Sequence, residues 1–264
     1  MVNVTRSAKS GNDWTTQELI AYNIMVNRQD PLPFFGRKLL SIDHLDSNLF
    51  STADPNTIPD VSKETYCFLA YLDRAMRANS GQESAINDLA RSVLEVTGFE
   101  KNGAILCTCY GIRFTICSDA NRTAKTDICL INRNSMILLV VHEDIGTKDP
   151  EPKVIADAIA TFQHNNRKRR EMGLDPIDAM TIPCITVIGT RPTFYMVPVT
   201  TQLSQSIITG QYPERTTVVT RCAPPSRVFE GMEVPDYRRA ALQYYTTFRE
   251  QAKVCWSTFI EGSM

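Results

Sequence analysis

Residues 126–144 carry the sequence TDICLINRNSMILLVVHED, in which two strand-like segments flank a short polar one. The second segment is continuously apolar, which is typical of a strand buried on both faces. Asn132–Ser135 supply turn-forming residues between the two segments. The pattern predicts a β-hairpin, with Asp127 and Glu143 near each other at the end remote from the turn. His142 should point to the opposite face of the strand from Glu143, as a packed or surface histidine.

The residues that follow this hairpin alternate between helical and strand-like patterns. We expect a helix over 151–170, strands over 182–190 and 193–199, a helix over 199–210 closed by Gly210, an edge strand over 215–222 and an amphipathic helix over 235–259. A helix between two strands makes a crossover connection, which places the strands parallel in one sheet. The predicted fold class is therefore α/β, with a mixed sheet and helices on both faces.

The residues that precede the hairpin are predicted to be helical first and extended later. Helices are expected over 14–29, 62–78 and 83–97, an irregular arm over 37–60, and a hairpin or two short strands over 103–118. Residues 1–79 would form an N-terminal helical arm packed on a core of residues 80–264, as one globular unit. The aromatic side chains of the last helix would suit either a homodimer interface or a cover for the sheet.

Composition excludes several classes of protein. The chain has 264 residues, 43% hydrophobic residues and a net charge of −1, with no apolar run long enough to span a bilayer. The first residues lack a secretory signal, and the eight cysteines form no CxxC pair, as expected for free thiols inside the cell, in cytoplasm or nucleus. The near-zero net charge implies that any attraction to nucleic acid must come from a local patch.

The acidic residues at the remote end of the hairpin are candidates for a metal site. Asp127 begins one strand, and Glu143 and Asp144 end the next. Carboxylates at adjacent strand ends suit a hard cation such as Mg²⁺, which binds through one or two carboxylates, waters and phosphate oxygens. The alternative is that these acids only mark the boundaries between strands and loops.

The order of elements resembles that of the PD-(D/E)XK nuclease superfamily. Thr126-Asp127 corresponds to the PD element, Glu143-Asp144-Ile145 to the E-x-K element, and Gln163 lies on the following helix, as in several branches. The stretch from Thr126 to Arg170 is also similar to a family of uncharacterised basidiomycete fungal proteins that have EDK where this chain has EDI. The resemblance covers about residues 80–260 and implies a restriction-endonuclease-like fold.

The resemblance implies a nuclease that depends on Mg²⁺ or Mn²⁺ and hydrolyses phosphodiesters of DNA or RNA. Its implied metal ligands are Asp127, Glu143, Asp144 and Glu83, with Asp88 and Glu95 as alternatives to Glu83 on the same helix. Gln163 would orient phosphate or water. The dense basic segment 166–170 would contact the nucleic-acid backbone through Asn166, Arg167, Lys168, Arg169 and Arg170, or would simply be a solvated helix end.

The motif lysine is missing from this chain, because Ile145 occupies its position. In active members that lysine positions the attacking water and stabilises charge that develops on the phosphate. Lys148 or Lys125 could substitute for it. Otherwise the chain would be an inactive nuclease-fold binding or scaffold protein. A second alternative, a small-molecule enzyme in the same cleft, has no supporting motif: the sequence contains no nucleophile elbow, dinucleotide loop or zinc spacing.

Overall fold

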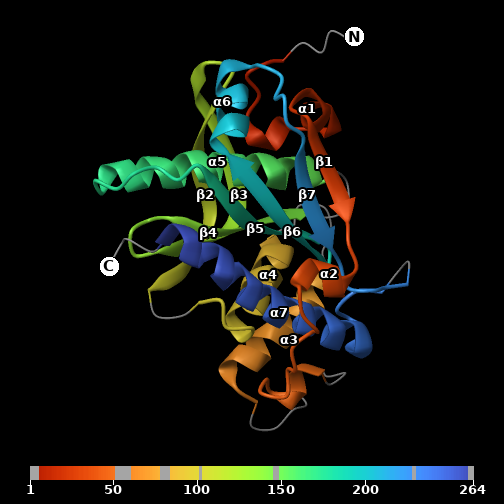
Figure 1. Ribbon diagram of the computed structural model, residues 1–264. Helices are drawn as coiled ribbons and strands as arrows, with labels where there is room; N and C mark the ends of the chain where they lie inside the picture. Colours follow the sequence, from red (N-terminus) through yellow and green to blue (C-terminus); the bar gives the residue numbers. More distant parts are fainter. Residues whose placement is uncertain are drawn as a thin grey trace.

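A seven-stranded mixed sheet forms the centre of the computed structural model, which describes residues 6–50, 61–77, 84–100, 103–144, 149–227 and 230–260 (Figure 1). Its strands are β1 (Ile24–Arg28), β2 (Ala104–Ile116), β3 (Asp119–Asn132), β4 (Ile137–Asp144), β5 (Ala179–Ile188), β6 (Arg191–Thr200) and β7 (Thr217–Cys222). Their spatial order is β1-β7-β6-β5-β4-β3-β2. The pairs β1–β7 and β4–β5 are parallel, and the other neighbours are antiparallel. The predicted mixed sheet is confirmed.

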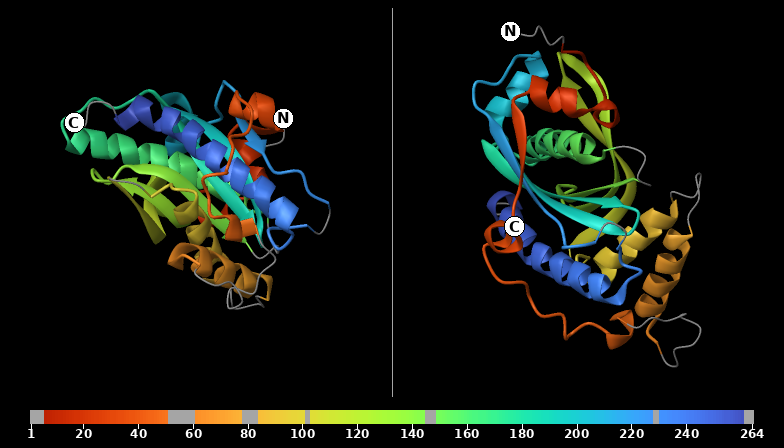
Figure 2. Two further views of the ribbon diagram at one scale, coloured as in Figure 1. Left: turned by 90° about the horizontal axis from the view of Figure 1, so that it is seen from below. Right: turned by 90° about the vertical axis from the view of Figure 1, so that its right-hand side faces the viewer.

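Helices cover both faces of this sheet (Figure 2). One face carries α1 (Thr16–Ala21), α5 (Glu151–Glu171) and α6 (Thr201–Thr209). The other carries α2 (Pro31–Phe35), α3 (Lys63–Met76), α4 (Ser84–Val96) and α7 (Pro235–Ile260). Short 3-10 turns occur at Gly11–Asp13 and Ser47–Phe50. The predicted succession of a helix, strands, a second helix and two further strands is therefore present as α4, β2–β4, α5 and β5–β6.

The hairpin of β3 and β4 forms as the sequence predicts. Ile128 pairs with Val141 in antiparallel register. Asn132 closes the turn, because its side-chain oxygen accepts hydrogen bonds from the backbone N–H groups of Asn134 and Met136 at 3.0 and 2.9 Å. The turn chemistry therefore lies in the same polar segment that interrupts the two apolar ones.

Helix α5 is buried on almost every side. All nine residues from Val154 to Phe162 are at most 3% exposed. The hairpin of β2 and β3 curves across this helix and reaches α6, where Cys117 and Ser118 donate backbone hydrogen bonds to the carbonyls of Ile207 and Ile208 (Figures 1 and 2). A helix without a polar face is stable only when its neighbours surround it, and here the curved sheet does so.

Three predicted elements differ from the structure. The expected helix over 14–29 is wrong beyond Ala21, because Asn23 adopts a left-handed φ of 51° and residues 24–28 pair as strand β1 with β7. Residues 104–116 form one long strand instead of a hairpin. Strand β7 is not an edge strand, since β1 covers its free side.

The N-terminal region belongs to the same hydrophobic core as the sheet. Trp14 stacks on Tyr22 with ring centroids 5.6 Å apart and also contacts Phe114 of β2. Gly11 allows this close packing, because a Cβ there would lie 2.9 Å from that of Ala124. Residues before position 80 are therefore more than a helical arm, since they supply both a strand and core side chains.

The last helix covers the sheet. Tyr244, Tyr245, Phe248 and Trp256 are buried within the chain, and the indole N–H of Trp256 donates to the carbonyl of Leu138. These aromatic side chains thus account for the apolar face of α7 without a second subunit. No helix in the described ranges is both long and apolar enough to cross a membrane.

Candidate functional site

The ends of β3 and β4 bring Asp127 and Glu143 together. Asp127 lies one position beyond the Ile128–Val141 pair. Its Oδ2 atom accepts a hydrogen bond from the backbone N–H of Glu143 at 2.8 Å. The predicted proximity of these two residues is confirmed, and the carboxylate of Asp127 remains 26% exposed.

The carboxyl group of Glu143 is buried beside other acids. Neither of its oxygens has a hydrogen-bond partner in the described part of the chain. Burial raises the pKa of Glu143 well above its usual value, and the nearby charges of Asp127 and Asp88 raise it further. A buried carboxyl without partners is stable only when it is protonated or when a cation neutralises it.

Helix α4 contributes Asp88 to this environment. Asp88 was an alternative to Glu83 as the acidic residue of this helix, and it is close enough to raise the pKa of Glu143. The other alternative, Glu95, forms an ion pair with Arg91 at 2.9 Å. Glu83 lies outside the described residues, so its predicted role as a metal ligand stays a prediction.

His142 and Asp157 lie on the side of Asp127 that faces α5. The Nδ1 atom of His142 is 3.5 Å from Oδ2 of Asp127 and 3.6 Å from Oδ2 of Asp157. His142 is 4% exposed and Asp157 is fully buried, so the predicted packing of His142 is confirmed. Burial raises the pKa of Asp157, and the neighbouring His142 opposes this shift in pKa.

Asp157 is a residue that the sequence analysis missed. It is the only charged residue in VIADAIATF, residues 154–162. A single acid inside an apolar helix that lacks a polar face is the signal that could have found it, because a buried charge requires a specific partner.

Strand β2 is kinked directly across from Asp127. The pairs Thr108–Ile128 and Tyr110–Thr126 place Cys109 opposite Asp127. Cys109 has a left-handed φ of 52°, which is costly for a residue with a side chain. This irregularity interrupts the strand ladder beside the carboxylates.

Several predicted residues of this region cannot be placed. Ile145 and Lys148 lie outside the described residues, as does the side chain of Asp144. Lys125 is described and exposed on β3, two positions before Asp127, which puts both on the same face of the strand. Of the two lysines that could substitute for the motif lysine, Lys125 is the described one, and it shares a strand face with Asp127.

Three carboxamide side chains of α5 bind backbone groups of other segments. Gln163 accepts from the N–H of Thr115 at 2.9 Å and donates to its carbonyl at 3.1 Å. Asn165 makes the same pair of bonds with Ile137, at 2.9 and 2.8 Å, and Asn166 with residue 177, at 2.8 and 2.9 Å. Gln163 and Asn166 thus hold β2 and the segment before β5, and the structure does not bring them to the carboxylates.

Replacement of Gln163 by alanine tests this structural assignment. Loss of both hydrogen bonds to Thr115 should lower the free energy of unfolding by about 1–2 kcal/mol, since this half-buried backbone can bond partly to water. Urea denaturation measures the change. An unchanged stability together with lost phosphate binding would instead favour the predicted role of Gln163 in orienting phosphate or water.

The basic segment at the end of α5 divides into structural and exposed residues. Arg169 is buried, and it donates to the carbonyls of Asp175 and Phe259 at 2.7 and 2.9 Å. Arg170 is exposed. Arg167 and Lys168 line a surface groove with residues of β2 and β3. Only part of the predicted phosphate-binding segment is therefore available to a ligand.

Two carboxyl groups lie at these adjacent strand ends, and carboxylates are ligands that hard divalent cations bind. The unpartnered oxygens of Glu143 and the exposed carboxylate of Asp127 are of the donor type that Mg²⁺ prefers. No three His, Cys, Asp or Glu side chains gather in a metal-binding arrangement within the described ranges. Waters and phosphate oxygens would have to complete the coordination of such a cation.

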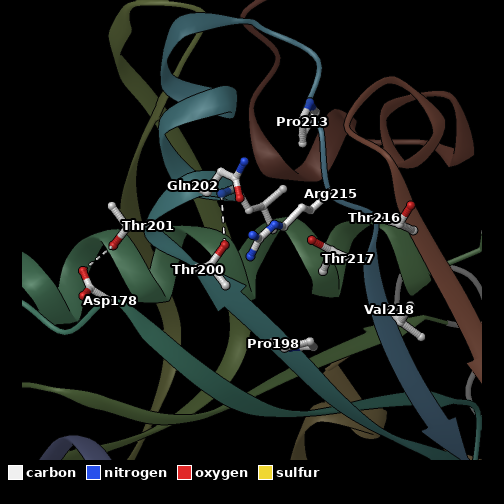
Figure 3. Close-up of a pocket in the computed structure, with 11 residues that line it drawn as sticks. Asp178, Pro198, Thr200, Thr201, Gln202, Pro213, Arg215, Thr216, Thr217 and Val218 are labelled. Atoms are coloured by element: carbon white, nitrogen blue, oxygen red, sulfur yellow. Dashed lines mark hydrogen bonds between the residues drawn. The ribbon is translucent and has the colours of Figure 1, made fainter.

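A separate hollow of about 410 Å³ lies at the N-terminus of α6, lined by Thr200, Thr201, Arg215 and their neighbours (Figure 3). The hydroxyl of Thr200 is already engaged, because it accepts from the N–H of Leu203 at 3.1 Å. Thr200 pairs with Ala179, eight residues from the partner of Glu143 on β5, which corresponds to roughly 26 Å. This hollow is therefore remote from the carboxylates.

The sequence matches no protein-family model, and no similar protein is found among the curated ones. The chemistry of this chain must therefore be inferred from its own residues.

Proposed function

We propose that the chain is a PD-(D/E)XK-like phosphodiesterase that acts on DNA or RNA with Mg²⁺ or Mn²⁺. The observation that carries this proposal is the pair of Asp127 and Glu143 at adjacent strand ends. The Asp127 carboxylate accepts a hydrogen bond from the backbone N–H of Glu143. The Glu143 carboxyl is buried without a hydrogen-bond partner in the described part of the chain, and the charge of Asp127 contributes to its raised pKa. Such a pair of acids is favourable when a cation lies against it.

The arrangement of elements supports the proposal. An antiparallel unit of β2, β3 and β4 is followed by α5 and by β5, which lies parallel to β4. This is the order of elements on which the resemblance to the nuclease superfamily depends. Asp88 on α4 supplies an acidic residue on the preceding helix, as the resemblance requires.

Asp127, Glu143 and His142 would have distinct roles in this reaction. A bound divalent cation would polarise a phosphoryl oxygen and lower the pKa of a bound water. Asp127 and Glu143 would hold it, and the hydrogen bond from the N–H of Glu143 orients the Asp127 carboxylate. His142, between Asp127 and Asp157, restricts the position of Asp127 from the side of α5.

Ile145 favours a second candidate function, a binding protein that has kept the fold and lost hydrolysis. An isoleucine side chain can neither activate a water molecule nor stabilise charge on a phosphate. The bonds between Gln163 and Thr115 also remove a candidate for orienting the substrate. Asp127 and Glu143 would then bind a cation, either alone or together with an anionic ligand, and no bond would be hydrolysed.

Cleavage of labelled DNA and RNA, with Mg²⁺ and with Mn²⁺, separates these functions. Wild type is expected to cleave slowly, and Asp127→Ala to be inactive. Ile145→Lys should raise the rate by about 10²–10³-fold, the usual contribution of one electrostatic group that acts in the transition state.

The outcomes of this experiment are distinct. Cleavage by Ile145→Lys alone would favour the binding protein. If no variant cleaves and neither ion raises the melting temperature of wild type, the proposed phosphodiesterase is wrong, since a ligand of the native state must stabilise it.

A further inference from the structure

A groove of about 580 Å³ lies between the β2–β3 hairpin and the C-terminal half of α5. The hairpin contributes Gly111 and Arg113 from β2 and residues 120–123 from β3. Helix α5 contributes its residues on the other side, beginning at His164. The groove is therefore built from two elements that lie far apart in the sequence.

Positive charge predominates in this groove. Its lining contains four cations, Arg113, Arg122, Arg167 and Lys168, and one carboxylate, Glu171. Arg122 is paired with Asp119 and Lys168 with Glu171, both at 2.8 Å. Within the described ranges, Arg113 and Arg167 form no ion pair with an acid.

Arg113 and Arg167 are held close to each other. Burial lowers the pKa of Arg167, and the charge of Arg113 lowers it further. The carboxylate of Glu171 opposes this shift in the pKa of Arg167, but Glu171 forms its ion pair with Lys168. The like charges of Arg113 and Arg167 repel, so a bound anion between them would be stabilised.

Gln163 fixes the relative position of these two arginines. Its amide joins α5 to Thr115, which is two residues from Arg113 on β2. Arg167 follows Gln163 by four residues, about one turn of the helix. The same contact that removes Gln163 from the carboxylates therefore builds the cationic groove.

We propose that this groove binds the phosphodiester backbone of a nucleic acid, through Arg113 and Arg167. The identity of the ligand rests on the proposed function, whereas the charge of the groove does not. Guanidinium groups bind phosphate oxygens through paired hydrogen bonds. The described residues that line the groove include no Phe, Tyr or Trp, so we expect its contacts to be to phosphates and not to stacked bases.

One nucleic-acid strand bound in the groove could also reach the carboxylates. Arg167 follows Asp157 by ten residues on α5, which corresponds to about 15 Å along the helix axis. This distance equals roughly four nucleotides of a duplex strand. Binding should be independent of sequence and should weaken as salt concentration rises.

Gly111 allows a test that leaves every cation in place. It is exposed, its φ is not positive, and a Cβ built on it meets no atom within 4 Å. Gly111→Glu introduces a negative charge into the groove, and Gly111→Lys introduces a positive charge of similar length. Arg74→Ala, on the exposed side of α3, is the matched control for the loss of one surface arginine in Arg113→Ala.

Binding is measured by fluorescence anisotropy with a labelled DNA duplex and an RNA duplex of the same sequence, in EDTA at low salt. We expect Gly111→Glu and Arg113→Ala each to weaken binding about tenfold. Arg113→Ala should also reduce the slope of log affinity against log salt concentration by about one unit, because one fewer ion is released on binding. Gly111→Lys and Arg74→Ala should bind as tightly as wild type or more tightly. The difference between the DNA and RNA affinities identifies the polymer.

Three results would overturn this inference. The first is that wild type binds neither duplex. The second is that Gly111→Glu binds as tightly as wild type. The third is that Gly111→Lys and Gly111→Glu weaken binding equally, which would indicate a steric effect. Vesicles that contain anionic phospholipid are tested in parallel. If wild type binds these vesicles but neither duplex, the first of these results applies. EDTA and the Asp127→Ala variant keep the binding test separate from hydrolysis. Binding in EDTA, together with absence of cleavage in the separate assay with Mg²⁺ and Mn²⁺, would refute only the phosphodiesterase.

Discussion

Replacement of Asn165 by alanine is expected to lower the free energy of unfolding by about 3–4 kcal/mol, because each buried polar group left without a partner costs about 1–3 kcal/mol. Asn165 is fully buried, and its amide bonds to both the N–H and the carbonyl of Ile137. Ile137 stands where the register between β3 and β4 shifts. The variant would leave both backbone groups without partners inside the core.

Urea denaturation of Asn165→Ala and Asn165→Asp, with Asn27→Ala as control, measures this effect. Asn27 is exposed on β1, and its replacement should change stability by less than about 0.5 kcal/mol. Asn165→Asp keeps the acceptor for the N–H of Ile137 but sets an anionic oxygen against its carbonyl, so it should be at least as destabilising as alanine. A loss below about 1 kcal/mol in both Asn165 variants would mean that water replaces the amide.

Replacement of Glu143 by glutamine is expected to make stability less dependent on pH and to raise it at high pH. The pKa of Glu143 is raised in the folded protein by burial, and also by the charges of Asp127 and Asp88. The folded state therefore keeps a proton that the unfolded chain has released. Stability from this group is complete below the unfolded pKa and is lost as pH rises through the folded pKa.

The slope of this dependence follows from the number of protons bound. Between the unfolded and folded pKa values, wild type should lose about 1.4 kcal/mol of stability per pH unit relative to Glu143→Gln. Thermal and urea unfolding in EDTA, at intervals from about pH 5 to pH 8, measure the difference. Glu214→Gln, at an exposed position, should follow wild type.

Addition of Mg²⁺ at the upper end of this pH range extends the experiment. A cation at the carboxylates should raise the melting temperature of wild type. It should also reduce the difference in stability between wild type and Glu143→Gln, because the neutral amide of the variant cannot balance the charge of the cation. Parallel pH profiles for wild type and Glu143→Gln would show that the carboxyl is solvated, and would remove the main support for a cation at this position.

Much of the fold could be predicted from local pattern. The hairpin around Asn132, the long helix from Glu151 and the capping position of Gly210 depend on residues close in sequence. The proximity of Asp127 and Glu143 followed from the same hairpin, since antiparallel pairing about a known turn determines which residues meet.

Other features required partners that are distant in sequence. Ile24 forms a strand because it lies beside Thr217, and no local pattern in residues 24–28 distinguishes that strand from the end of a helix. The segment containing Gln163 and Asn166 has the composition of a polar helix end, from which the sequence predicts that its side chains contact a ligand. Their amides instead pair with backbone groups more than ten residues away, a choice made only when β2 and β5 pack on α5.

The sequence by itself determined the α/β class, the hairpin and the two carboxylates at its open end, because strand period, turn residues and helix caps act over a few residues. Tertiary structure decided the rest: Asp157 beside His142, Asp88 near Glu143, and the groove in which Arg113 meets Arg167. The physical reason is that burial and electrostatic repulsion depend on distances between side chains, and only the packing of the curved sheet around α5 sets those distances.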